Sequence, residues 1–312
     1  MRRVESAVVV LAATISPLAT TPTATHCNPC LTPIAGSAAL VSASGEGPKW
    51  DHNDIDAWNE IGDCAAPTNL YQSPLNFDTT QSYANSTDVL TIHYPTSIDA
   101  EVINNGHGSP QLVFGEGPHV ELNGERYNLL QIHFHVPSEE TIDGVAPAFD
   151  AHYVHQNPDS KALLVIGQLY NAGDQEFPLL TTAVENDPTD PAAEPKAVTG
   201  INLQATMPSE GTRTCSRFYV PSHVLPSLTQ PPTHPPTFLS AFWTFQGSLT
   251  TPPCSGGLSW FVNSVPYSAT AAQIEALKAV GIGQGLENGN ARPTQPLNGR
   301  DVTVTYPTVE AA

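Results

Sequence analysis

Basic side chains are scarce in this sequence. Its 312 residues include 11 Lys and Arg against 30 Asp and Glu, which gives a formal net charge of −19 at pH 7. A surface of that sign repels nucleic acids and anionic membranes, because both carry dense negative charge. We therefore expect no nucleic-acid partner and interpret the acidity as a solubilising surface, with a salty or acidic habitat as the alternative explanation.

Long hydrophobic runs are also missing beyond the first residues. No segment approaches the roughly 18 uninterrupted apolar residues of a membrane-spanning helix, so we expect no stable membrane insertion. The N-terminus has Arg2 and Arg3 followed by an apolar stretch at 7–13, which is the order of a secretory signal. The sequence predicts a signal peptide at 1–25, a flexible leader at 26–47, and a protein that is secreted or extracellular, or periplasmic if the source is bacterial.

Charged residues of both signs together make up only 13% of the chain, whereas prolines number 30 and glycines 22. This balance argues against long solvated helices and favours strands and turns. Short runs rich in β-branched and aromatic residues recur between Gly, Pro, Asn and Asp clusters, at 89–94, 111–114, 127–136, 151–155 and 162–170. They predict an α+β, β-dominated single domain built on a large, twisted, mostly antiparallel central β-sheet with short peripheral helices.

Two helices are expected. One covers about 177–184, and the other begins at Thr270, where Thr270 and Gln273 form a capping-box pattern and Gly281 is expected to end the helix.

The boundaries of the domain follow from composition. Six prolines between Cys215 and Phe238 predict a surface excursion around 215–238, because proline does not fit a strand or helix interior. The folded domain is predicted at 48–306, with 307–312 as a tail and no internal repeat.

The five cysteines fit an oxidising compartment but leave one thiol over if only internal pairs form. Cys27-Asn28-Pro29-Cys30 is a CxxC, yet no second CxxC completes a zinc ribbon and no βαβ pattern surrounds it. Asn85-Ser86-Thr87 is a glycosylation sequon, usable only in a eukaryotic secretory route.

Histidines carry the chemistry that the sequence indicates. Gln131-Ile132-His133-Phe134-His135 places two imidazoles at i and i+2, which share one face of a strand. A lone pair of this kind is more often two surface histidines than a metal site. A second strand-like run, Asp150-Ala151-His152, can lie antiparallel beside the first and bring a third imidazole to the same face. Three protein ligands with an open fourth position are typical of catalytic zinc.

Six motifs stand along the chain at Gln72-Ser73-Pro74, Asn104 to His107, Gln131 to Glu139, Ala151 to His155, Gly247 to Cys254 and Arg292 to Arg300. Together, and in this order, they resemble the secreted type of the α-class carbonic anhydrase family, and the resemblance covers about Trp50 to Thr303.

The resemblance implies an enzyme, a zinc lyase with Zn²⁺ as cofactor and carbon dioxide and bicarbonate as small-molecule substrates. Zinc-bound hydroxide would hydrate carbon dioxide reversibly to bicarbonate and a proton, and a histidine would export the proton. The implied metal ligands are His133, His135 and His152. Gln131, Asp150 and the Asn290 carbonyl would accept hydrogen bonds from the ligand rings. Asp150 stands where the family usually has glutamate, and Glu140 where it often has histidine.

The remaining site residues are also implied by the resemblance. Thr250 would orient the hydroxide while donating its own proton to Glu139. His107 would be the proton shuttle, with Asn105 holding a water, and His52 stands where the family commonly has tyrosine. Thr251 would lie near the bicarbonate end, and the apolar wall for carbon dioxide would be Val154, Val165, Leu249, Leu258 and Trp260. Cys64 and Cys254 would form the disulfide of extracellular members.

Two other functions remain open on sequence alone. A catalytically weak relative could act as an extracellular binding or mineral-associated module, but such members usually lose a zinc ligand and this chain keeps all three. An ester hydrolase would need a specific ester pocket, for which no motif is present. The sequence leaves the oligomeric state open, and we interpret the other histidines as surface or core residues: His26, His93, His119, His155, His223 and His234.

Overall fold

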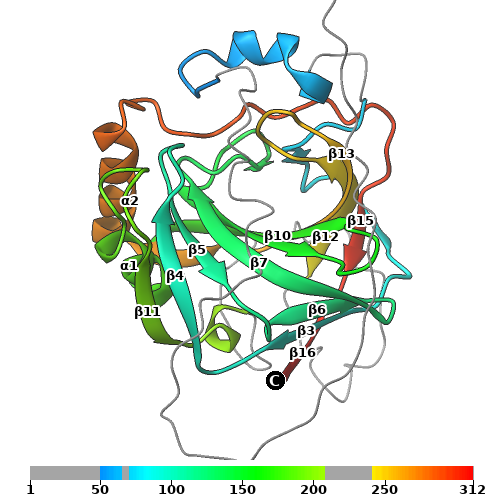
Figure 1. The fold of residues 1–312 in the computed structure, drawn as a ribbon. Coiled ribbons are helices and arrows are strands. Elements are labelled where there is room, and N and C mark those ends of the chain that lie inside the picture. Colours follow the sequence, from blue (N-terminus) through cyan, green and yellow to red (C-terminus); the bar gives the residue numbers. More distant parts are fainter. Residues whose placement is uncertain (1–49, 65–69, 208–240, 312) are drawn as a thin grey trace, which may run out of the picture. The chain divides into compact units, whose positions relative to one another are not determined.

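The computed structural model describes residues 50–64, 70–207 and 241–311. The predicted signal peptide and leader, the Pro-rich excursion, and Cys27, Cys30 and Cys215 lie outside the described residues. Among the residues described, one large sheet dominates and the helices are short, which confirms the predicted fold class (Figure 1).

The sheet has 14 strands in the described part of the chain, and most neighbouring strands run antiparallel. Its main path, in spatial order, is β11 (Lys196–Ile201), β4 (Ile98–Asn104), β5 (Pro110–Phe114), β7 (Glu125–His135), β9 (Phe149–Gln156), β10 (Leu163–Gly173), β13 (Gly256–Asn263), β12 (Phe242–Ser248), β15 (Thr303–Thr305) and β2 (Ala84–Asn85). Four strands extend it off this path, namely β3 (Leu90–Tyr94), β6 (His119–Leu122), β14 (Tyr267–Thr270) and β16 (Thr308–Ala311). A separate parallel pair joins β1 (Asn76–Phe77) to β8 (Thr141–Ile142).

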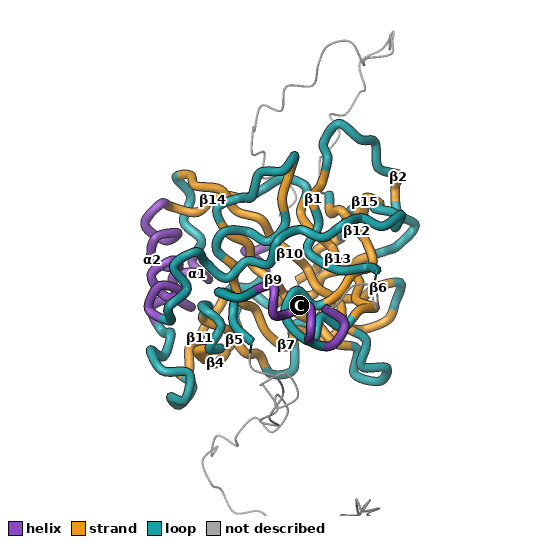
Figure 2. The backbone as a smooth tube through the Cα atoms, turned by 90° about the horizontal axis from the view of Figure 1, so that it is seen from above, coloured by secondary structure: helices purple, strands orange, loops and turns teal. Residues whose placement is uncertain are grey.

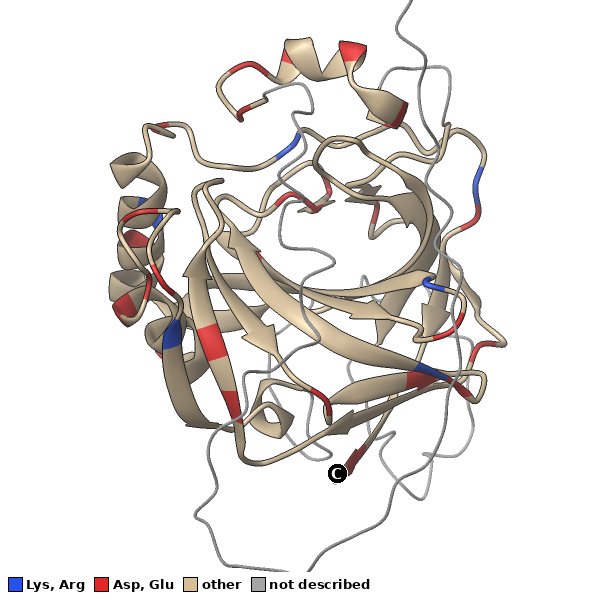
Figure 3. Ribbon diagram, viewed as in Figure 1, with Lys and Arg blue, Asp and Glu red and all other residues tan. Residues whose placement is uncertain are grey.

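Side chains along the central strands β7, β9 and β10 alternate between two environments, the larger apolar core on one face of the sheet and the opposite face. On β9, Phe149, Ala151 and Tyr153 enter the larger apolar core, and the intervening positions 150, 152 and 154 face the other side of the sheet. Figure 3 shows that β9, β10, β12 and β13 are nearly free of charged residues. The one acidic residue of these four strands is Asp150, which shares the His152 face of β9.

Both helices lie on the same side of the sheet in two perpendicular views (Figures 1 and 2). Helix α1 (Pro178–Glu185) begins with proline at its first position, and α2 (Ala271–Gly283) begins after Thr270 with the predicted capping box. The prediction that Gly281 ends α2 was wrong, because the helix continues to Gly283. The left-handed residue that follows the helix is Gly285 (φ 82°), so the chain turns there. Three short 3₁₀ segments complete the helices of the described residues: η1 (Ile55–Glu60), η2 (Gly62–Cys64) and η3 (Gln204–Thr206).

The C-terminal segment predicted as a tail forms a strand instead. Residues 308–311 are β16, which pairs in parallel with β3 so that Glu310 lies opposite His93. These residues are ordered because their backbone pairs with an exposed edge of the sheet. A local sequence pattern does not predict such pairing.

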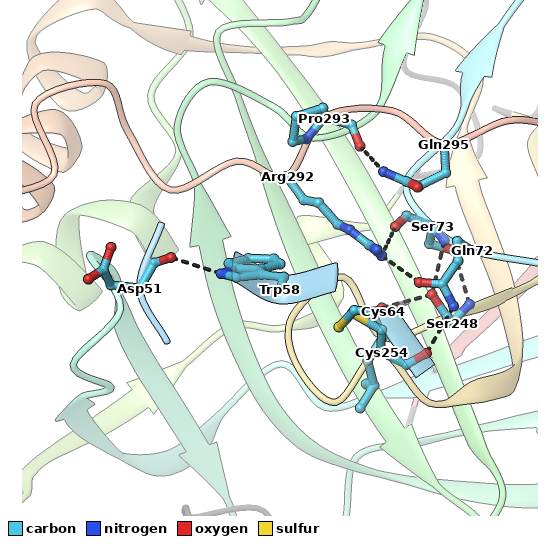
Figure 4. The surroundings of a disulfide bond; sticks show 11 residues. Asp51, Trp58, Cys64, Gln72, Ser73, Ser248, Cys254, Arg292, Pro293 and Gln295 are labelled. Atoms are coloured by element: carbon cyan, nitrogen blue, oxygen red, sulfur yellow. Dashed lines mark hydrogen bonds between the residues drawn. A yellow bond between two sulfur atoms is a disulfide. The ribbon is translucent and has the colours of Figure 1, made fainter. Parts of the chain in front are cut away.

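The disulfide between Cys64 and Cys254 is present and joins η2 to the loop that follows β12 (Figure 4). Beside it, the Gln72 side chain donates a hydrogen bond to the Cys254 carbonyl at 3.1 Å. The Arg292 guanidinium donates to Gln72 Oε1 at 2.8 Å and to the Ser73 carbonyl at 2.7 Å. Three of the six sequence motifs are therefore tied together by buried polar contacts.

No helix among the described residues is both long enough and apolar enough to cross a membrane.

Candidate metal centre and active-site cavity

Three histidine side chains converge on one face of the sheet. His133 on β7 lies directly opposite His152 on β9 in the antiparallel register, and His135 follows His133 by two residues on the same face. One nitrogen of each ring lies within 4.8 Å of the corresponding nitrogens of the other two. The register thus produces the convergence that the spacing predicted.

Hydrogen-bond acceptors fix the orientation of two of these rings. His133 Nδ1 lies 2.8 Å from Gln131 Oε1, and His135 Nδ1 lies 2.9 Å from the Asn290 carbonyl oxygen. An oxygen of this kind only accepts, so each Nδ1 carries the proton and each Nε2 keeps its lone pair. His135 Nε2 is buried without a hydrogen-bond partner. A buried lone pair with no donor facing it is what a metal ligand needs before the ion binds.

The third ring is turned the other way. His152 Nε2 lies 3.4 Å from Glu140 Oε2 and 3.6 Å from Asp150 Oδ1, which leaves Nδ1 as the nitrogen free to serve as a ligand. The other oxygen of Asp150 accepts hydrogen bonds from Ser138 Oγ at 3.0 Å and from the Glu139 amide at 2.7 Å. The carboxylate oxygen nearest to His152 Nε2 therefore belongs to Glu140.

Packing holds the His152 ring in this position. The Trp260 ring stands edge-on to it, with ring centroids 5.0 Å apart and planes at 79°. Gly167 is the register partner of His152 on β10, and a Cβ there would meet Val262 at 3.3 Å. Glycine at position 167 thus leaves room for Val262, and a Cβ there would touch the His152 ring only at an ordinary contact distance of 3.8 Å.

Burial sets the charge state of the histidines. It lowers the pKa of His135 to about 4 and the pKa values of His133 and His152 below the ordinary value. The neutral imidazole is the form that binds metals, so the three rings are in the ligating form at neutral pH.

Three carboxyl groups are buried beside the rings. Burial raises the pKa of Asp150 to about 6 and that of Glu140 to about 7, and burial together with these two neighbours raises the pKa of Glu139. Buried carboxylates are costly unless a positive charge compensates them. A divalent cation among the histidines would supply that charge, so the donor set and its surroundings fit zinc.

Glu139 interacts with two distant segments. Its Oε1 accepts a 2.8 Å hydrogen bond from the Arg292 amide, and its pKa, which burial raises, is lowered in part by the Arg292 amide and the Thr250 side chain. Thr250 is buried at the cavity wall. The hydrogen bond from Thr250 to Glu139 stays a prediction, since Glu139 Oε2 has no hydrogen-bond partner among the described residues, and the contribution of Arg292 could not be read from its motif.

A cavity of about 660 Å³ opens above the three histidines. Its apolar lining includes Val154, Leu163, Val165, Leu249 and Trp260, and its polar lining includes Asn105, His107, Gln131, Thr250, Thr251 and Asn290. Leu258 is buried in the apolar cluster that contains Val154, Val165 and Trp260, but it does not line the cavity. The sequence did not identify Leu163, which reaches the wall because β10 lies beside β9.

Comparisons with known proteins agree with this geometry. The model of the eukaryotic-type carbonic anhydrase family matches residues 53–306. The chain belongs to the carbonic anhydrase family. A carbonic anhydrase of Pectobacterium atrosepticum is 30% identical over 269 residues, which cover 85% of this chain and 94% of the relative. A carbonic anhydrase of Pectobacterium carotovorum is 33% identical over 233 residues, which cover 75% of this chain and 79% of the relative. A solved carbonic anhydrase of Chlamydomonas reinhardtii in complex with acetazolamide superposes with a TM-score of 0.65 at 29% identity, covering 84% of this chain and 99% of that one. An enzymatic role in carbon dioxide hydration follows from membership of this family.

Two further histidines of this carbonic anhydrase line the same cavity as the triad. The His107 ring stacks on Trp50, with centroids 4.1 Å apart and planes at 9°. The His52 ring is 6.3 Å from His107, and both of its nitrogens are buried without hydrogen-bond partners. Burial lowers the pKa of His107 and lowers the pKa of His52 to about 3. The Asn105 side chain accepts a 2.8 Å hydrogen bond from the His107 amide, which positions the turn that carries His107.

Proposed function

We propose that this chain hydrates carbon dioxide reversibly with a zinc ion held by His133 Nε2, His135 Nε2 and His152 Nδ1. The observation that carries the proposal is the convergence of these nitrogens, each on a ring whose other nitrogen faces an acceptor. When bound, zinc lowers the pKa of a coordinated water to about 7, as is general for carbonic anhydrases, and so supplies a nucleophile at neutral pH.

Thr250 and Glu139 orient the nucleophilic oxygen in this proposal. The Thr250 hydroxyl donates a hydrogen bond to the Glu139 carboxylate, which the Arg292 amide holds in place. The Thr250 oxygen then accepts a hydrogen bond from the O–H of the nucleophile, which leaves the reacting lone pair directed into the cavity.

Carbon dioxide is apolar and uncharged, so an apolar surface can bind it, and water competes only weakly for such a surface. Val154, Val165, Leu249 and Trp260 provide that surface beside the histidines, and Leu258 supports it from behind. Thr251 lines the same cavity and would contact bicarbonate.

His107 exports the proton in this proposal. It lines the cavity, is half-buried, and stacks on Trp50, so it can exchange protons with both the cavity and the solvent. His52 is a poorer carrier, because its pKa of about 3 keeps it neutral and neither nitrogen has a hydrogen-bond partner. Asn105 helps to order water at this end of the cavity.

In this proposal Glu140 takes the role that was expected of Asp150, which is to accept a hydrogen bond from the third ligand, His152. The His152 Nε2–H donates to the Glu140 carboxylate, while the shorter Asp150 side chain secures the turn at Ser138 and Glu139. A carboxylate acceptor behind a ligating histidine fixes the ring and raises its basicity.

Zinc analysis combined with stopped-flow hydration of carbon dioxide tests the proposal. We expect one zinc per chain at the cavity and loss of activity in His133→Ala and His152→Ala. Full activity in protein that holds no metal would refute the zinc mechanism, and zinc binding without hydration would favour the catalytically weak relative.

The location of the protein belongs to the same proposal. The buried Cys64–Cys254 disulfide supports export to an oxidising compartment, where such bonds persist. N-terminal sequencing of protein recovered from the medium or periplasm, with a start near residue 26, would test it.

A further inference from the structure

A second group of histidines lies outside the cavity, on the face of β16, β3 and β6 opposite the apolar core. His93 on β3 lies opposite His119 on β6 in the antiparallel register, and Glu310 on β16 lies opposite His93 on the other side. Glu121 follows His119 by two residues and so shares its face. These strands lie together at the lower edge of Figure 1. The sequence offered no reason to connect these residues, because they come from three distant segments.

A hydrogen-bond acceptor fixes the His119 ring of this group, and a carboxylate lies near the His93 ring. His119 Nδ1 lies 2.8 Å from the Gly117 carbonyl oxygen, so its Nε2 carries the lone pair. His93 Nδ1 lies 3.7 Å from Glu310 Oε2, which favours a proton on Nδ1 and a lone pair on Nε2. His93 Nε2 is buried and has no hydrogen-bond partner. A histidine that faces a carboxylate or carbonyl with one nitrogen and offers the other is arranged as a metal ligand.

Glu121 completes a ligand set. A carboxylate oxygen of Glu121 and one nitrogen each of His93 and His119 lie within 4.8 Å of one another. In a tetrahedral zinc site with bonds of about 2.0–2.1 Å, ligand atoms are about 3.4 Å apart, so the group must close by at most about 1.4 Å. The two rings are stacked at a centroid distance of 4.6 Å, and one of them must turn about its Cβ–Cγ bond to bring both lone pairs to one ion.

We infer that His93, His119 and Glu121 bind a second divalent metal ion of the zinc class, with Glu310 as the acceptor behind His93. Two imidazoles and one carboxylate form a common zinc ligand set, and water can fill the fourth position. The ion would join β6 to β3, and through Glu310 to β16, at the edge of the sheet. None of these residues lines the cavity, so the inference does not depend on the catalytic proposal.

One positive charge opposes the ion. Arg126 on β7 lies opposite Glu121 in the register, and its charge adds to the effect of burial, which is the main cause that lowers the pKa of His119. Its guanidinium is engaged by Asn128 Oδ1 at 2.7 Å and by the Gly117 carbonyl at 3.4 Å. The site should therefore bind more weakly than the cavity, and removal of Arg126 should strengthen it.

The test is a calorimetric titration of the full chain with zinc chloride. The cavity site is first loaded with zinc, and the excess zinc is removed by dialysis. We expect about one further zinc per chain in the wild type and its loss in His93→Gln/His119→Gln. Replacing an acceptor behind a ligand costs about 10–100-fold in metal affinity, so Glu310→Gln should weaken this event about tenfold. Arg126→Gln is the matched control, and it should act in the opposite direction by making zinc bind at this site several-fold more tightly.

Glu121→Gln keeps the size of the side chain and removes one charged ligand, so it tests the site even if the double histidine variant folds poorly. Circular dichroism verifies the fold of each variant, and carbon dioxide hydration should be unchanged in all of them. No additional zinc in the wild type, or an additional event that persists in Glu121→Gln and in the folded double variant, would overturn the inference.

Discussion

The contact between Glu140 and His152 gives the sharpest test of how this carbonic anhydrase holds its metal. Glu140 is fully buried, and its Oε2 lies 3.4 Å from His152 Nε2. Glu140→Gln keeps the shape of the side chain but replaces the carboxylate with a neutral amide. Because loss of an acceptor behind a zinc ligand costs about 10–100-fold in affinity, we expect zinc to bind about tenfold more weakly, which is about 1.4 kcal/mol.

A compensating change distinguishes this role from general damage to the core. Asp150 Oδ1 already lies 3.6 Å from the same nitrogen, so Asp150→Glu extends a second carboxylate toward it by one methylene. In Glu140→Gln/Asp150→Glu we expect much of the lost zinc affinity to return. Glu275→Gln on the exposed face of α2 is the matched control and should leave the affinity unchanged.

Competition with a chromogenic chelator measures these affinities directly, and zinc dissociation rates provide a second measurement. Folding is monitored independently by circular dichroism of the metal-free variants. Unchanged affinity in Glu140→Gln would show that Glu140 does not hold His152. A double variant no tighter than Glu140→Gln alone would show that the carboxylates are not interchangeable.

Three further predictions concern proton export, the disulfide and pH dependence. His107→Ala should lower the maximal hydration rate in weak buffer while leaving kcat/KM nearly intact, and added imidazole should restore the rate; an unchanged maximal rate would exclude His107 as the shuttle. Replacing Cys64 and Cys254 with serine should reduce the free energy of unfolding by about 2–5 kcal/mol in urea titrations, and an unaltered midpoint would contradict this. Burial lowers the pKa of His155 to about 3, so the neutral ring contributes stability above its unfolded pKa of 6.5 that is lost as the pH falls toward 3. In His155→Gln, which can still pair with Tyr94, stability should fall less steeply over that range, and parallel curves would argue against the assignment.

Periodicity in the sequence determined the parts of the molecule that depend on local rules. The spacing of His133 and His135 predicted a shared strand face, because side chains alternate in any strand. The Thr270 capping box predicted the start of α2, because its hydrogen bonds join residues three apart. The Cys64–Cys254 pair followed from the family resemblance rather than from any local rule.

Tertiary structure decided the contacts whose partners are distant in the sequence or differ by a single methylene. Asp150 and Glu140 both carry a carboxyl group near His152, and only the folded turn at 138–140 determines that the longer side chain lies nearer. His93 and His119 meet because β3 pairs with β6, and Glu310 joins them because β16 pairs with β3, although residues 307–312 resembled a tail. Local sequence encodes which face a side chain occupies, whereas strand order and register decide what stands opposite it.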